Sequence, residues 1–208
     1  MPAPRPVRAL ISPATLAHNA RGMTGVVDVR RDAYGHGLAV CEPVLVEAGL
    51  ALLTDDDAPA GSPIDPAELW GLPGGGGRPV MSLHGSVLST KLLRAGEGVS
   101  YGYTFRAERD TRVALVSGGY AQGIVRELGN RVHVGVAGGT APIVGRVAMD
   151  ACVIDIGGLE VSRGDEVAFF GDPDHGEPAL DAWLRATGLT APEIVSLVGA
   201  RAVRQVRA

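Results

Sequence analysis

The sequence predicts a short α/β segment with parallel strands, followed by a larger, mostly antiparallel β domain. In the first part, short apolar runs alternate with stretches of helical spacing, which is the pattern of parallel βαβ units. In the second part, short apolar runs recur between glycine-rich turns, which is typical of a compact antiparallel sheet or barrel. The glycine run Gly74–Gly77 separates the two patterns and is expected to form a flexible joint. We therefore divide the chain into residues 1–77 and residues 78–208.

About three strands and two helices are expected in the first part. Ser12 and Pro13 open the first helix, because serine is a preferred N-cap and proline suits the first helical position. Gly22 or Gly25 ends this helix, and Gly49 stops the second. The expected strands cover residues 7–12, 26–29 and 50–53, and the second helix covers residues 38–48.

This part is too short for a complete (β/α)₈ barrel. Such a barrel takes roughly 250 residues, at about 30 residues for each βαβ step. The pattern stops in residues 54–66, which are rich in Asp, Pro and Gly. In the second part, we expect strands, then two helices, then a last strand. The strands are expected within 80–88, 97–105, 112–117, 132–136, 141–156, 166–170 and 202–206, and the helices near 178–187 and 191–198.

Composition excludes several classes of partner. The 208 residues are 46% hydrophobic and 20% charged, with a net charge of −4 and no basic stripe, so a nucleic-acid partner is not expected. No apolar run approaches the roughly 20 residues that span a bilayer. Residues 1–6 lack the apolar core of a signal peptide, so we expect a cytoplasmic location. Cys41 and Cys152 are too few for a zinc site or a disulfide framework.

Several ordered segments carry a resemblance to a known family. They are Val-Arg-Arg-Asp-Ala-Tyr-Gly-His-Gly at 29–37, Gly-Glu-Gly-Val-Ser-Tyr-Gly at 96–102, Gly-Tyr-Ala-Gln-Gly at 119–123, Ile-Val-Gly-Arg-Val-Ala-Met-Asp at 143–150 and Gly-Asp-Glu-Val at 164–167. In this order and at these separations they resemble the motifs of alanine racemases, which are pyridoxal-phosphate (PLP) enzymes of fold type III. Any one of these motifs alone would be weak evidence.

The resemblance implies a fold for each part of the chain. The β domain resembles the family's C-terminal domain over nearly its whole length, and residues 7–53 resemble the first segments of its TIM barrel. The middle of that barrel is missing between about Thr54 and Asp65. The first part is thus expected to be an α/β remnant of a TIM barrel. By resemblance the protein is also expected to be a homodimer, with a site built from both subunits.

The residue that holds PLP in the family is replaced here. The family pattern Lys-Ala-Asp/Asn-Ala-Tyr-Gly-His-Gly places the PLP lysine at Arg30, and a guanidinium cannot form the imine. Lys91 is the only lysine of the chain. Ile64 falls at an arginine that contacts the pyridine nitrogen, and Ala200 at a phosphate-binding tyrosine. We therefore expect no cofactor.

Other site residues of the family remain. Tyr101 matches the tyrosine that removes the substrate α-proton and reaches across the dimer. Tyr120 and Met149 match residues of the substrate entrance and carboxylate pocket, and Tyr34 matches a phosphate-binding tyrosine. As a base, Tyr101 needs a neighbouring cation or hydrogen-bond donors, and Arg30 and Arg31 would supply the cation if the two segments meet, within or across subunits.

Each assignment has a structural alternative. Tyr101 is either an acid/base or an aromatic residue packed at an interface, and Tyr120 is either a pocket lip or an ordinary turn residue. Met149 either contacts substrate or fills the core, and Asp150 either binds substrate or orients a turn. His36 either contributes to acid–base chemistry or makes a structural hydrogen bond.

Three functions are consistent with these residues. The first is an acid–base enzyme without PLP, which uses Tyr101, Tyr120 and Arg30 for isomerisation, epimerisation or cyclisation of a small molecule, in a setting such as specialised metabolism. Tyr34, His36, Met149 and Asp150 would then bind the substrate. The second is a non-catalytic protein that binds a small ligand or dimerises. The third, which the sequence favours least, is a PLP-dependent racemase.

Overall fold

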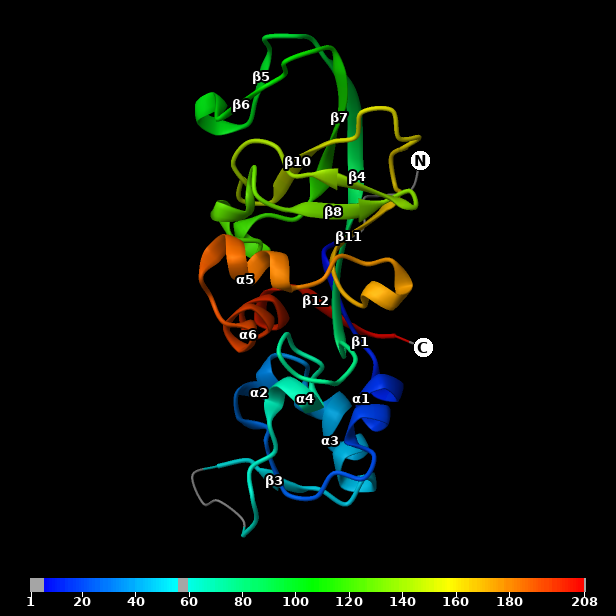
Figure 1. Ribbon diagram of the computed structural model, residues 1–208, viewed down its shortest axis with the longest axis vertical. Helices are drawn as coiled ribbons and strands as arrows, with labels where there is room; N and C mark the ends of the chain where they lie inside the picture. Colours follow the sequence, from blue (N-terminus) through cyan, green and yellow to red (C-terminus); the bar gives the residue numbers. More distant parts are fainter. Residues whose placement is uncertain (1–5, 56–59, 208) are drawn as a thin grey trace.

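The computed structural model describes residues 6–55 and 60–207 and is elongated, with strands gathered toward one end and helices toward the other (Figure 1). The prediction of no signal peptide falls mostly on residues 1–5, which lie outside the described residues. The expected deletion point between Thr54 and Asp65 includes residues 56–59, which also lie outside them. Across the described ranges, no helix has the length and apolar character needed to cross a membrane.

The first part contains the expected strands and helices and two further short helical turns. Ser12 caps the first helix as predicted, because its side chain accepts a hydrogen bond from the backbone N–H of Thr15. The elements are β1 (Arg8–Ile11), α1 (Pro13–Ala20), β2 (Val26–Asp28), α2 (Arg30–Tyr34), α3 (Leu38–Glu47), β3 (Ala51–Leu53) and α4 (Pro66–Leu69).

Only two of the three strands expected to be parallel pair with each other. β2 and β3 form a parallel pair, with Val27 opposite Leu52. β1 instead belongs to the large sheet of the β domain, and the expectation that it extends the parallel pair is wrong. Both of its edges are already occupied, by β12 (Val203–Val206) in parallel and by β4 (Met81–Leu93) in antiparallel orientation, so no edge remains for β2. The division at residues 77 and 78 stays a prediction, although β1 crosses it.

The long strand β4 is the spine of the β domain. Its first half pairs with β1 and β11, and its second half pairs with β7, so it joins all parts of an eight-stranded sheet within the described residues. A separate hairpin, β5 with β6, extends from the far end of the molecule (Figure 1). The strands are β5 (Gly98–Val99), β6 (Phe105–Arg106), β7 (Thr111–Ser117), β8 (His133–Val136), β9 (Gly139–Pro142), β10 (Ala151–Asp155) and β11 (Glu166–Phe170).

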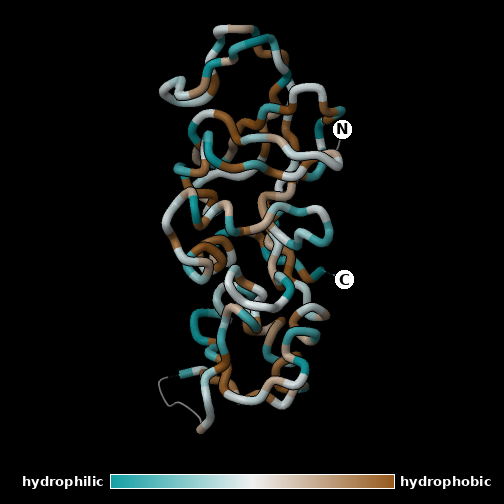
Figure 2. Tube along the Cα trace, in the orientation of Figure 1, coloured by the Kyte–Doolittle hydropathy of each residue, from teal (hydrophilic) through white to brown (hydrophobic). Residues whose placement is uncertain are grey.

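Two helices, α5 (Asp181–Thr187) and α6 (Ala191–Arg201), follow the sheet and lie between it and the first part of the chain (Figure 1). One hydrophobic core runs through both parts. It includes Leu16 and Leu45 from the first part and Phe169 and Val198 from the second. Hydrophobic residues accordingly appear in both halves of the molecule (Figure 2). Burial of this shared apolar surface holds the short α/β segment against the β domain.

The glycine run expected to be a flexible joint instead packs closely on α4. A Cβ atom added to Gly75 would lie 2.3 Å from the carbonyl oxygen of Ala67, and one added to Gly77 would lie 1.9 Å from that of Glu68. Only glycine allows this approach of two backbone segments. These glycines therefore fix the turn that leads from α4 to β4.

Candidate functional site

A cavity of about 540 Å³ lies beside α2, at the end of β2, and we call it the Arg30 cavity. It contains two of the predicted site residues, Arg30 and Tyr34. Its other lining residues, all of them polar or charged, are Asp28, Arg31, Thr54, Asp55 and Ser196. The cavity thus offers hydrogen-bonding groups and charges of both signs.

The guanidinium of Arg30 is folded back onto Asp28. Its Nη2 lies 2.9 Å from Oδ2 of Asp28 and its Nε lies 3.1 Å from Oδ1, which also accepts the backbone N–H of Arg30 at 3.0 Å. Hydrogen bonds from Arg30 lower the pKa of Asp28, so this carboxylate stays ionised. Sequence reasoning did not select Asp28, although a carboxylate two residues before a functional arginine is a visible signal.

The segment after Arg30 is a turn of left-handed helix. Residues 31–34 all have φ between 52° and 62°, a conformation that non-glycine residues rarely adopt. Asp32 holds the turn from two directions. Its carboxylate accepts the backbone N–H of Leu38 at 2.7 Å and forms an ion pair with Arg204 of β12. Hydrogen bonding and the nearby cation outweigh burial and lower the pKa of Asp32.

Helix α6 packs against the other side of the turn. Gly35 follows the left-handed residues, and a Cβ atom added to Gly199 of α6 would lie 2.0 Å from the carbonyl oxygen of Gly35. This contact places Tyr34, which is half-buried, on the wall of the Arg30 cavity. Burial raises the pKa of Tyr34, so its phenol stays protonated at neutral pH and can donate a hydrogen bond.

His36 does not reach the cavity, and the prediction that it contacts substrate is not supported by its position. Its side chain is fully buried and stacks on Trp70, with ring centroids 4.5 Å apart. Nδ1 lies 2.9 Å from the carbonyl oxygen of Ala33 and must donate to it, which leaves Nε2 buried without a partner in the described structure. Burial lowers the pKa of His36 to about 4, so the ring is neutral and structural.

A second cavity, of about 530 Å³, lies against the β5–β6 hairpin, and we call it the Tyr101 cavity. Tyr101 is 73% exposed and Tyr103 is 62% exposed. The guanidinium of Arg106 lies over the Tyr103 ring, 5.5 Å from its centroid. Lys91, the only lysine, also lines this cavity. Lys91 lies on β4, beyond the end of the strand expected over 80–88.

The remaining predicted residues meet at a third place. The backbone N–H of Tyr120 donates to Ala148, and that of Ala121 donates to Met149, so two motifs distant in sequence are joined. Met149 is 55% exposed, which excludes the alternative that it fills the core. Asp150 accepts a hydrogen bond from the side chain of Gln122 at 3.3 Å. It thereby braces the turn that carries Tyr120.

The guanidinium of Arg126 lies over the ring of Tyr120, 4.8 Å from the centroid. This turn also approaches α6, because Arg201 donates to the Tyr120 carbonyl oxygen at 3.2 Å.

The predicted acid/base and the predicted cation do not share a cavity within one chain. Arg30 lines the cavity at the end of β2, whereas Tyr101 lines the one at the hairpin, and the two elements lie in opposite halves of the molecule (Figure 1). One chain therefore does not place the Tyr101 phenol beside Arg30.

Structural similarity to solved proteins establishes the fold. The crystal structure of alanine racemase from D-cycloserine-producing Streptomyces lavendulae aligns with a TM-score of 0.83 at 21% identity, over 100% of this chain and 98% of that one. The biosynthetic alanine racemase of Pseudomonas aeruginosa aligns with a TM-score of 0.80 at 20% identity, over 98% and 100%. This likeness shows that the chain has the alanine racemase fold.

The sequence match shows the family. The model of the alanine racemase C-terminal domain matches residues 80–206. Alanine racemase of Thermobifida fusca is 42% identical over 143 residues, and that of Frankia casuarinae is 43% identical over 145 residues. These matches cover 69% and 70% of this chain but only 37% and 36% of the relatives. The chain belongs to the alanine racemase family, and its match spans little more than a third of these relatives' length.

Proposed function

We propose that this protein is an acid–base enzyme that transfers a proton on a small molecule without PLP. The observation that carries the proposal is Arg30, which stands at the family's lysine position and is held there by Asp28. The reaction class is isomerisation, epimerisation or cyclisation. The first part of the chain is, in this proposal, a remnant of the family's TIM barrel.

The residues at three positions that contact PLP in the family do not fit this cofactor. A guanidinium is protonated at all physiological pH values and has no amine to form an imine. The backbone N–H of Ile64 is used to pair with Val26, and its side chain packs against the core, so it offers no charge to a pyridine nitrogen. Ala200 offers no hydroxyl group to a phosphate. These differences support a reaction that does not involve this cofactor.

The proposal requires two copies of the chain. Tyr101 is exposed on a hairpin that projects from the molecule, and the Arg30 cavity lies elsewhere on the same chain (Figure 1). Tyr101 therefore acts in this cavity only when a second copy supplies it. We accordingly propose a homodimer in which the hairpin of one subunit faces the Arg30 cavity of the other.

The proton chemistry follows from the groups that would meet there. Tyr34 stays protonated, because burial raises its pKa, and it donates a hydrogen bond or a proton to the substrate. The phenol of Tyr101 takes or returns a proton at carbon, next to Arg30 and Arg31. Tyr120 supports the substrate at the rim of the site.

A mixed-variant experiment tests this arrangement. The Tyr101→Phe and Arg30→Gln variants are each expected to lose solvent proton exchange by about 100-fold or more, measured by NMR in D2O with a panel of amino acids and β-dicarbonyl compounds. Mixing the two variants creates heterodimers with one intact site, so part of the activity returns. The Tyr103→Phe variant is the matched control and stays active. Full activity of Tyr101→Phe, or no recovery on mixing, would refute the shared site.

The separation of the two cavities also favours a second function, a non-catalytic protein that binds a small ligand or dimerises. This alternative predicts a dimer, or a ligand complex, in which no compound of the panel exchanges a proton. A functional PLP racemase would show an imine absorbance with added PLP and a borohydride-stable adduct. We expect neither the imine absorbance nor a borohydride-stable adduct at residue 30.

A further inference from the structure

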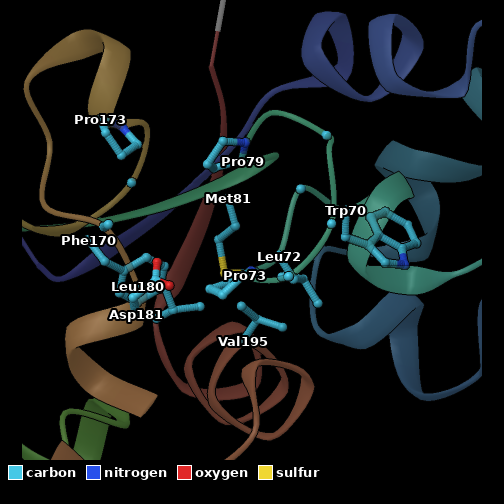
Figure 3. A pocket seen from close by; sticks show the side chains of 16 residues that line it. Trp70, Leu72, Pro73, Pro79, Met81, Phe170, Pro173, Leu180, Asp181 and Val195 are labelled. Atoms are coloured by element: carbon cyan, nitrogen blue, oxygen red, sulfur yellow. The ribbon is translucent and has the colours of Figure 1, made fainter. Parts of the chain in front are cut away.

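A third cavity lies where the two parts of the chain meet, and neither the sequence motifs nor the proposed function uses it. We call it the Trp70 cavity, and its volume is about 250 Å³. Its apolar walls come from β4, β11, α6, the loop that follows α4 and the segment that precedes α5 (Figure 3). The large hydrophobic wall residues that are at most 7% exposed are Trp70, Leu72, Met81, Phe170, Leu180 and Val195.

The size of the cavity limits its occupant. An engineered apolar cavity of about 150 Å³ binds benzene, so a volume of about 250 Å³ has room for a phenyl ring with a two-carbon chain. The glycines of the loop 71–77 form part of the wall, so the cavity is bounded there by backbone rather than by long side chains. Figure 3 shows Met81, Leu72 and Val195 converging on this space.

The cavity carries one charge. Among the described residues that line it, Asp181 alone is charged, and it is exposed at the rim. No hydrogen bond or ion pair engages its carboxylate within the described structure. Apolar walls with a single carboxylate at the mouth match an apolar molecule that ends in a cation, because the ammonium stays near solvent while the apolar part is buried.

We propose that the Trp70 cavity binds a small hydrophobic amine, with its ring or alkyl group on Met81 and Phe170 and its ammonium beside Asp181. Binding here is independent of the proton transfer proposed above. An effect of binding would nevertheless extend to the Arg30 cavity through α6. Val195 lines the Trp70 cavity, and its neighbour Ser196 lines the Arg30 cavity. Trp70 makes a second connection, since its ring centroid lies 6.4 Å from that of Tyr34.

Both tryptophans report on this cavity. Trp70 lines it, and Trp183 packs edge-on against Phe170, with ring centroids 5.2 Å apart. Titration of the full chain with 2-phenylethylamine is expected to change the tryptophan emission and saturate at a Kd of about 1 mM or below. The neutral isostere 2-phenylethanol is expected to bind about threefold to fivefold more weakly, and 3-phenylpropionate more weakly still.

Three variants decide the assignment. Asp181→Asn is expected to remove the preference for the amine over the alcohol, whereas Glu108→Gln, an exposed acidic residue on the hairpin side, keeps it. Ala179→Phe fills the cavity from its rim and is expected to abolish binding of both compounds, with circular dichroism confirming its fold.

Several results would overturn the proposal. They are the absence of a saturable response to about 10 mM amine in the natural chain, equal affinity for amine and carboxylate, and unchanged binding in Asp181→Asn. Proton exchange by the Arg30 cavity is measured separately, so failure of one proposal leaves the other readable.

Discussion

Acidification should destabilise this protein between about pH 6.5 and pH 4 because of His36. The ring is buried against Trp70, its Nδ1–H is used by Ala33, and its Nε2 faces no acceptor in the described structure. In the unfolded chain the same imidazole takes up a proton near pH 6.5. The unfolded state thus binds the proton more readily, so stability is present above pH 6.5 and is lost as pH falls toward 4.

The size of the effect follows from the two pKa values. The pKa of His36 is about 4 in the folded chain, against an ordinary value near 6.5. Each tenfold change in proton affinity is worth about 1.4 kcal/mol, so the free energy of unfolding should fall by about 3 kcal/mol over this range. That is a large part of the roughly 5–15 kcal/mol typical of a folded domain. Asp28 and Asp32, whose pKa values are lowered, add their losses only at more acidic pH.

Urea unfolding followed by tryptophan fluorescence at several pH values measures this dependence. The control is His36→Gln, which cannot titrate. This variant is less stable at pH 7.5, since it loses the stack on Trp70, so the comparison is between the two pH slopes. The natural chain should lose about 3 kcal/mol more than the variant between pH 7.5 and pH 4. Parallel slopes would show that His36 is not the group responsible.

Three further variants test a helix cap, a backbone contact and the loss of the lysine. Ser12→Ala removes the N-cap of α1 and should lower the free energy of unfolding by about 1 kcal/mol, measured by urea unfolding. Gly199→Ala forces a Cβ atom against the Gly35 carbonyl and should cost about 3 kcal/mol, with a loss well below 1 kcal/mol contradicting the packing. Arg30→Lys, made with Lys91→Arg to remove the other amine, restores an imine-forming group. It should still give no racemase activity with PLP, and alanine racemisation followed by chiral chromatography would contradict this.

Local signals in the sequence were sufficient for most of the elements. The cap at Ser12 was predictable because it depends on residues within one turn. The strand expected over 80–88 in fact extends to Leu93. The prediction stopped too early because a register shift between Val87 and Ser89 breaks the alternation that marks a strand. The pairing of β1 was missed because its partners come from distant parts of the chain, and periodicity carries no information about which strands pair.

The site was predicted less completely, in part because some of its contacts join distant parts of the chain. The resemblance assigned Tyr120 and Met149 to the substrate entrance and carboxylate pocket, which stays a prediction, and backbone hydrogen bonds join the two segments that carry them. His36 lies between two glycines and resembles a loop residue, yet Trp70, far along the chain, covers it. The pairing of Arg30 with Asp28 needed only the local sequence and was nevertheless missed.

The left-handed turn at residues 31–34 has a consequence for the order in which the protein forms. Left-handed backbone costs roughly 1–2 kcal/mol per residue, so four such residues cost about 4–8 kcal/mol, comparable to the stability of a whole domain. The contacts that offset this cost include those of Arg204 and Gly199, two residues that are synthesised after the turn. We therefore expect the stretch after Arg30 to take its final shape only once α6 and β12 have left the ribosome. The wall of the Arg30 cavity is thus made before the two elements that hold it, and takes its shape only after them.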